Sequence, residues 1–175
     1  MPRGISLLEN WGALFPTYFT FIMGTGIVAI AANETGQRVL GWIMCGINLL
    51  AGAIMCCSGL VRLTTEPGSV WRELCHHESG PAFLSIVAGT AVLGSDAVAF
   101  GISARFSLAL FGVAVVSWLF IIYCFLATVT EGRNKPSLEK GLSGSWLLVV
   151  VSTASLAVLG SDLLRDLGRP QALVF

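Results

Sequence analysis

Five long apolar stretches separated by short polar segments constrain the fold of this chain more than any other feature. A helix needs about 20 residues to cross the hydrocarbon core of a bilayer, and each stretch has about that length. Hydrophobic residues make up 55% of the chain and charged residues only 11%, where soluble domains carry about a quarter. We therefore predict an all-α integral membrane protein in which residues 1–175 form a single transmembrane domain. The predicted transmembrane helices are residues 14–32, 39–61, 81–100, 106–129 and 144–164.

The stretches are expected to be helices because an isolated strand leaves its backbone polar groups unpaired in lipid. They also lack the alternating pattern of an outer-membrane barrel. The first stretch is too long for the apolar region of a cleaved signal peptide, and other spans follow it. The orientation follows from the lysines and arginines, of which six lie on the N-terminal side of the membrane and four on the other. Because positive charge favours the cytoplasmic side, we predict a cytoplasmic N-terminus in the cell membrane.

An internal repeat links the first, third and fifth helices. The peptide AVLGSD occurs at 91–96 and again at 157–162. PTYFTFIMGT begins at Pro16 and PAFLSIVAGT at Pro81, an offset of 65 residues. The repeat unit is therefore a helical hairpin of about 65 residues, and the odd-numbered helices run parallel. Internal repeats are common in transporter folds, and parallel repeats predict that odd helices surround an axis while even helices form an outer ring.

Small and hydroxylated residues recur at equivalent positions of the odd helices. On the first helix they share one face, because their spacing of three and four residues matches the helical turn. We interpret them as candidates for the lining of a pore. Close packing between helices is the alternative, since small residues are common at helix contacts in membranes. The candidates are Thr17, Thr20, Gly24, Ser85, Gly89, Ser152, Thr153 and Ser155.

Two carboxylates, Asp96 and Asp162, occupy the same position of the repeated peptide AVLGSD. Carboxylates inside a membrane are functional candidates, for example in proton coupling. The alternative is that both reach water at a pore mouth. Asp96 lies about 22 Å along its helix from Pro81 at 1.5 Å per residue, so we expect both side chains at the same depth near the outer surface.

The opposite ends of the odd helices are expected to attract anions. Helix N-termini carry partial positive charge and bind anions, and those of the odd helices would meet at the cytoplasmic mouth. Arg62, Arg72 and Lys140 are predicted to lie near the same mouth.

Other classes of site are not supported by the sequence. Cys75, His76, His77 and Glu78 are consecutive, and consecutive residues cannot all face one metal ion, so we predict no metal site. The sequence has no glycine-rich phosphate loop, Ser/His/Asp set or HExxH motif, and its two adjacent histidines do not suit haem. We therefore predict neither an enzyme nor a cofactor. A formal net charge of zero gives no basic surface for nucleic acid, and the cysteines are interpreted as packing residues.

Three segments carry a family resemblance: YFTFIMGTGIVAIA, HHESGPAFLSIVAGTAVLGSD and KPSLEKGLSGSWLLVVVSTASLAVLG. They resemble the tellurite-resistance/dicarboxylate transporter family, which includes plant slow-type anion channels and fungal malic acid transporters. The resemblance covers about Asn10 to Leu164. It implies ten helices in five hairpins around a central pore, with the odd helices innermost. It also implies passive or proton-linked movement of anions such as malate-type dicarboxylates, sulfite, chloride or tellurite-related ions.

The five predicted helices correspond to half of that pseudo-fivefold barrel. The family's phenylalanine gate lies on its ninth helix and has no counterpart here. Two parallel copies of this chain would supply six inner and four outer helices, so simple dimerisation would not rebuild the pore. We therefore expect a truncated or split anion transporter or channel that needs a C-terminal half or oligomer partners. The alternative is a membrane interaction protein without transport activity, or a degenerate remnant.

Overall fold

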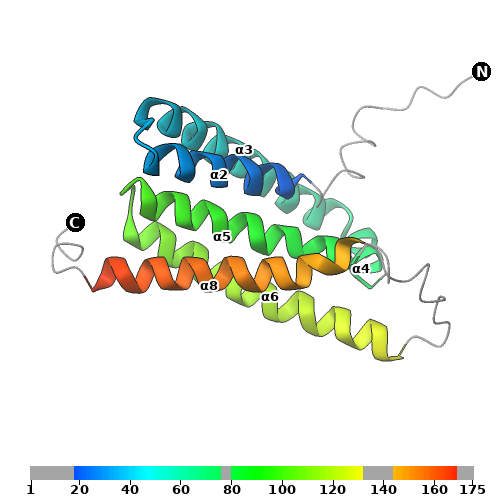
Figure 1. The fold of residues 1–175 in the computed structure, drawn as a ribbon. Helices are drawn as coiled ribbons and strands as arrows, with labels where there is room; N and C mark the ends of the chain where they lie inside the picture. The colour runs from blue at the N-terminus through cyan, green and yellow to red at the C-terminus, as the bar shows by residue number, and fades with distance from the viewer. Residues whose placement is uncertain (1–17, 76–79, 132–143, 169–175) are drawn as a thin grey trace, which may run out of the picture.

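The computed structural model describes residues 18–75, 80–131 and 144–168, and the regular structure within these ranges is helical (Figure 1). Two short 3₁₀ turns, η1 and η2, precede the helices α5 and α8. The elements are α2 (Phe19–Glu34), α3 (Arg38–Thr65), α4 (Pro67–Leu74), η1 (Gly80–Phe83), α5 (Leu84–Ala99), α6 (Ala104–Glu131), η2 (Gly144–Trp146) and α8 (Leu147–Leu167).

Four segments of the described chain are long and apolar enough to cross a membrane. They are Arg38–Thr65, Gly80–Ala99, Ala104–Thr128 and Leu147–Asp166. The apolar helix α2 is shorter, with 16 described residues, and residues 14–17 of its predicted span lie outside the described ranges. Helix α3 has 28 residues, which gives a length of about 42 Å at 1.5 Å per residue. It therefore exceeds a hydrocarbon core of about 30 Å.

The two hairpins α2–α3 and α5–α6 turn in the same way, at positions 65 residues apart. Gly36 has φ +83° and Gly101 has φ +64°, a left-handed conformation that glycine adopts without strain. The amide of Gln37 donates to the carbonyl of Ala32, and the amide of Ile102 donates to that of Ala97. In each case the amide donor lies five residues after the acceptor, which is the 6→1 hydrogen bond of the Schellman motif at helix C-termini. The 65-residue repeat seen in the sequence therefore includes the turn as well as the helix.

Helices α2, α5 and α8 lie in a row with α5 in the middle. They run in the same direction, and α3 and α6 run in the opposite direction (Figure 1). Helix α3 packs against α2 and α5, and α6 packs against α5 and α8. Of the α5 span 72% is buried, compared with 17–22% of the spans of α3, α6 and α8. The structure thus places one odd helix at the centre of the described bundle and the other two on either side of it.

Glycines allow these helices to approach closely. A Cβ atom added to Gly89 of α5 would lie 2.9 Å from Phe19 of α2, and one added to Gly94 would lie 2.6 Å from Leu159 of α8. Leu93 of α5 fills the space beside Gly52 of α3, and its cluster also includes Leu110 of α6. Helices α3 and α6 therefore pack near the same part of α5. Such contacts through small residues are typical of helices in lipid.

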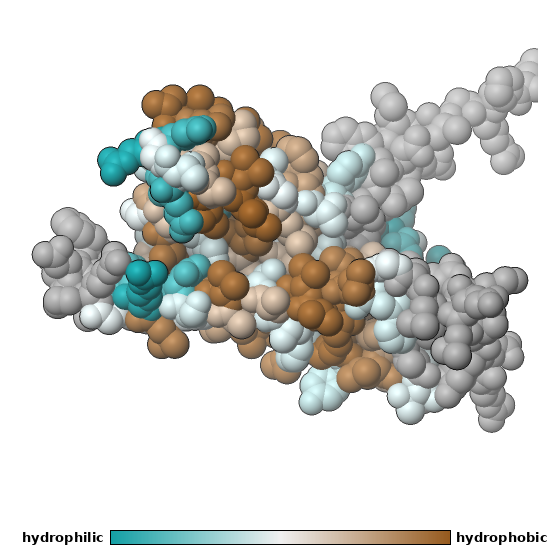
Figure 2. Space-filling model, viewed as in Figure 1, coloured by the Kyte–Doolittle hydropathy of each residue, from teal (hydrophilic) through white to brown (hydrophobic). Residues whose placement is uncertain are grey.

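The outward faces of the bundle are apolar. Large exposed side chains include Val39 and Leu50 on α3 and Val116 on α6. Figure 2 shows apolar residues over the middle of the visible face, with hydrophilic residues at the end where α2 joins α3 and α8 finishes. This distribution suits a bundle surrounded by lipid, because lipid tails contact apolar side chains at no cost.

The tryptophans Trp42 and Trp118 lie on even-numbered helices, which were predicted to form an outer ring, and their surroundings differ. Trp42 of α3 is 53% exposed and packs edge-on against Phe100. Trp118 of α6 is half-buried and packs against the core cluster of Leu84 and Ala114. Trp118 lies four residues after Ala114, on the face of α6 that contacts α5, so its position follows from the helical turn.

Candidate functional site

The predicted pore-lining residues fall into two groups in the structure. Thr20, Gly24 and Thr153 are exposed, and Ser155 is half-buried. Ser85, Gly89 and Ser152 are buried in helix contacts. The Ser85 hydroxyl donates to the carbonyl of Ala82 (2.7 Å) and the Ser152 hydroxyl to that of Val149 (3.1 Å). Thr17 lies outside the described residues.

Gly24 and Gly89 are equivalent in the repeat but have different surroundings. A Cβ atom on Gly89 would collide with Phe19, whereas one on Gly24 would meet nothing within 4 Å. The same position is thus a closed helix contact on α5 and an open surface on α2. The difference arises because α5 has a helix on each side in the row, and α2 has one.

A chain of hydrogen bonds connects α2, α3 and α5 at Asp96. The Thr25 hydroxyl donates to Asn48 Oδ1 at 2.7 Å, and Asn48 Nδ2 donates to Asp96 Oδ2 at 2.6 Å. Asn48 and Asp96 are both 0% exposed. The carboxylate therefore lies between helices in this structure and is shielded from solvent.

Asp162 has different surroundings from Asp96, although both belong to AVLGSD. It is half-buried on α8. The residues that follow Thr25 and Asn48 by the 65 positions of the repeat are Thr90 and Val113. The Thr90 hydroxyl donates to the carbonyl of Ile86 in its own helix at 2.7 Å, and Val113 is apolar and exposed. The amide that bonds to Asp96 is therefore replaced by an apolar side chain in the second hairpin, whereas the threonine is repeated.

Sequence reasoning identified Asp96 but missed Thr25 and Asn48. A signal was present for Asn48, because it is the one amide side chain in the predicted span 39–61. Polar side chains within spans usually bond to a neighbouring helix. Nothing in the sequence indicated which helix that would be.

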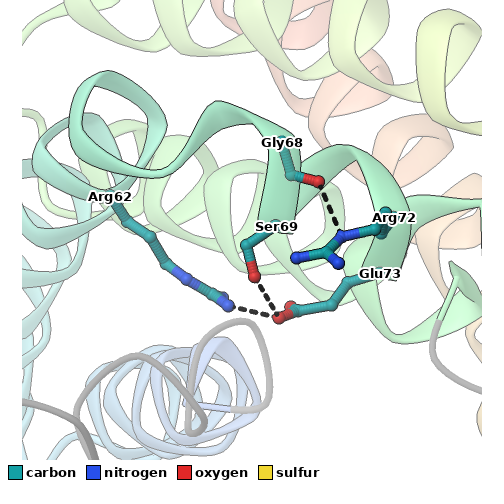
Figure 3. A network of polar contacts seen from close by, with 5 residues as sticks. All are labelled: Arg62, Gly68, Ser69, Arg72 and Glu73. Atoms are coloured by element: carbon teal, nitrogen blue, oxygen red, sulfur yellow. Dashed lines mark hydrogen bonds and ion pairs between the residues drawn. The ribbon is translucent and has the colours of Figure 1, made fainter.

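A second group of polar residues lies at the other end of the bundle, around α4 (Figure 3). Arg62, near the end of α3, forms an ion pair with Glu73 of α4. Glu73 also accepts a bond from Ser69 at 3.5 Å, and Arg72 donates to the carbonyl of Gly68 at 3.3 Å. Arg62 is therefore buried and paired, while Arg72 is exposed.

The N-terminal ends of α5 and α8 meet near this group. The 3₁₀ turns η1 and η2 contact each other, and η1 contacts α4. The sequence predicted that the third helix begins at Pro81, and the structure places a 3₁₀ turn there before the α-helix begins at Leu84. Lys140, also predicted at this mouth, lies outside the described residues.

The described residues contain no group of three or more His, Cys, Asp or Glu side chains arranged to hold a metal ion. Of the candidate cluster Cys75–Glu78, only Cys75 is described, because residues 76–79 lie outside the described ranges.

Repeated helical hairpins, apolar outer faces and several membrane-length helices define an all-α, multi-pass membrane protein. Comparison with known families identifies the family of this membrane protein. The chain belongs to the voltage-dependent anion channel family, which it matches over residues 13–175. This finding confirms the resemblance seen in the sequence. Members of this family are channels and transporters rather than enzymes. Searches of curated proteins and of solved structures found no match.

Proposed function

We propose that this chain forms part of the wall of a membrane pathway for a small anion, with α2, α5 and α8 as the inner helices. The observation that carries the proposal is the row of these three repeated helices, each neighbouring pair of which is bridged by an even helix, α3 or α6. In this arrangement α3 and α6 cover one side of the row, and the other side of α2, α5 and α8 is left to face a common region. Membership of an anion channel family supplies the substrate class.

The α4 end is the proposed entry for the anion. The N-termini of α2, α5 and α8 point toward this end (Figure 1), and helix N-termini favour anions. Arg72 is exposed there, whereas the charge of Arg62 is balanced by Glu73. Arg72 is therefore the described cation best placed to attract an anion. We assign this end to the cytoplasm, from the lysine and arginine bias, and the protein to the cell membrane.

The proposed lining includes Thr20 and Gly24 on α2 and Thr153 and Ser155 on α8, which are exposed or half-buried. Ser85, Gly89 and Ser152 line the pathway only if the helices around them separate. Further helices, from a C-terminal half or from partner chains, complete the wall beside α2 and α8. Chloride, sulfite, malate-type dicarboxylates and tellurite-related anions are the substrates to compare.

Anion flux into vesicles tests the proposal. Purified protein is reconstituted into liposomes that contain a halide-sensitive dye, and chloride entry is followed with valinomycin and potassium to balance charge. Sulfite and malate are then added as competitors. We expect flux above that of protein-free vesicles and inhibition by at least one competitor.

Variants locate the pathway. Thr20→Leu and Ser155→Leu are expected to reduce the flux, because each places a larger apolar side chain in the proposed lining. Val116→Leu is the control, since Val116 is 67% exposed on α6, on the proposed lipid side. Absence of flux from folded protein for every anion would reject the proposal and favour a membrane interaction protein. Equal flux in all three variants would reject the assigned lining.

A further inference from the structure

The hydrogen-bond chain from Thr25 through Asn48 to Asp96 leaves one polar atom unused. Asp96 Oδ2 accepts the bond from Asn48, but Asp96 Oδ1 is buried and has no hydrogen-bond partner among the described residues. A buried carboxyl oxygen without a partner costs on the order of 1–3 kcal/mol. Helices α2 and α3 therefore enclose an Asp96 carboxyl group of which one oxygen accepts no hydrogen bond from the described residues.

No positive charge faces this carboxyl group from the helices packed around it. The ionisable side chain of α2 is Glu34, its last residue, and α5 carries none besides Asp96. On α3 the ionisable group closest in sequence to Asn48 is the Cys45 thiol, which is buried and cannot carry a positive charge. Arg38 and Arg62 lie at opposite ends of α3. Among the described residues, a negative charge at Asp96 would therefore have no cation to balance it, which is costly in the interior of a membrane protein.

We propose that Thr25, Asn48 and Asp96 form a binding site for a single proton. In the bound state a proton from water joins one oxygen of Asp96, converting the carboxylate into a neutral carboxylic acid and leaving one negative charge fewer in the bundle. In the unbound state the proton returns to water. The site lies between α2, α3 and α5, and it does not require that the chain conduct anions.

The three side chains can accommodate both states without moving their heavy atoms apart. In the unbound state Thr25 donates to Asn48 Oδ1, and Asn48 Nδ2 donates to the carboxylate, as in the structure. In the bound state the acid O–H donates to Asn48 Oδ1 after the amide turns over, because the two ends of a carboxamide have nearly the same shape. Asn48 Nδ2 then donates to Thr25, whose hydroxyl donates to the carbonyl of Phe21, 2.8 Å away.

The packing of α2 closes this site. A Cβ atom on Gly26 would meet Val92, Asn48 Nδ2 (2.7 Å) and Asp96 Oδ2 (3.0 Å), so the backbone of α2 lies directly over the polar pair. Exchange of the proton with water requires α2 to move away from α5. Proton binding is thus linked to the α2–α5 contact.

Infrared spectroscopy of the reconstituted chain tests this proposal. A protonated carboxylic acid has a carbonyl band separate from the amide bands, and isotopic labelling of aspartate restricts the search to Asp96, Asp162 and Asp166, the three aspartates of the sequence. We expect a labelled acid band that is still present at about pH 5, where an ordinary aspartate with a pKa of about 3.9 is ionised, and that disappears as the pH rises further. Asp96→Asn should remove the band and Asp162→Asn should keep it.

Two further variants keep the test decisive if Asp96→Asn does not fold. Asn48→Leu removes the partner of the acid and should shift the band to the higher frequency of an acid without a hydrogen bond. Thr25→Val, nearly isosteric, should shift it less. An absent acid band in the folded wild-type protein at about pH 5, above the ordinary pKa of aspartate of about 3.9, would overturn the proposal. So would a band that persists in Asp96→Asn or keeps its frequency in Asn48→Leu.

Discussion

Replacing Gly26 with alanine should disrupt the contact between α2, α3 and α5. Gly26 is buried, and its new Cβ atom would collide with Val92 and lie 2.7 Å from Asn48 Nδ2 and 3.0 Å from Asp96 Oδ2. Val92 belongs to the buried part of α5, and Asn48 and Asp96 are bonded to each other. The methyl group can fit only if α2 moves outward or the bond between Asn48 and Asp96 breaks.

The expected loss of stability combines three effects. Overpacking of a filled core costs about 1–3 kcal/mol. Loss of the partner of a buried polar group costs a further amount of about 1–3 kcal/mol. The better helix propensity of alanine returns about 1 kcal/mol. The net destabilisation is therefore about 1–5 kcal/mol.

Gly24→Ala is the matched control, because it makes the same change two residues away on the same helix. A Cβ atom at Gly24 meets nothing within 4 Å, so only the propensity gain remains. Thermal unfolding in detergent, followed by tryptophan fluorescence, compares the variants. We expect Gly26→Ala to lower Tm by about 2–4 °C for each kcal/mol lost, and Gly24→Ala to leave it unchanged or raise it. Equal Tm values for the two variants would refute this reasoning.

Three other results follow from the structure. Leu159→Ala should destabilise the chain by about 2–5 kcal/mol in the same unfolding assay, because Leu159 is 0% exposed and packs on α5 at Gly94. Gly36→Ala should lower stability, because Gly36 has φ +83°. Gly46→Ala is the control and should not lower it, since Gly46 lies at an open helical position. A lower Tm for Gly46→Ala than for Gly36→Ala would contradict the turn assignment. In a cysteine-free background, a cysteine at Arg38 should react with an impermeant reagent added outside cells, and one at Lys135 should not; the opposite labelling pattern would reverse the proposed orientation.

The membrane class, the helical segments and the repeat were readable from the sequence because each depends on local pattern. Hydropathy over about 20 residues identifies a span wherever its neighbours lie. The equivalence of Gly36 and Gly101 is likewise encoded locally, since a helix end needs one left-handed residue at a fixed position. The family, too, was recognisable from short motifs, and the match over residues 13–175 confirms it.

The partners of each small or polar side chain were decided only by the tertiary structure. Thr25 and Asn48 are 23 residues apart, and Asn48 and Asp96 are 48 apart. Their contact depends on the rotation and depth of three separate helices. Gly24 and Gly89 match in the repeat, yet one is open and the other is closed by Phe19. A repeated sequence specifies the same helix each time, but a helix in the middle of a row has two neighbours and a helix at its end has one, so equivalent residues come to lie in different surroundings.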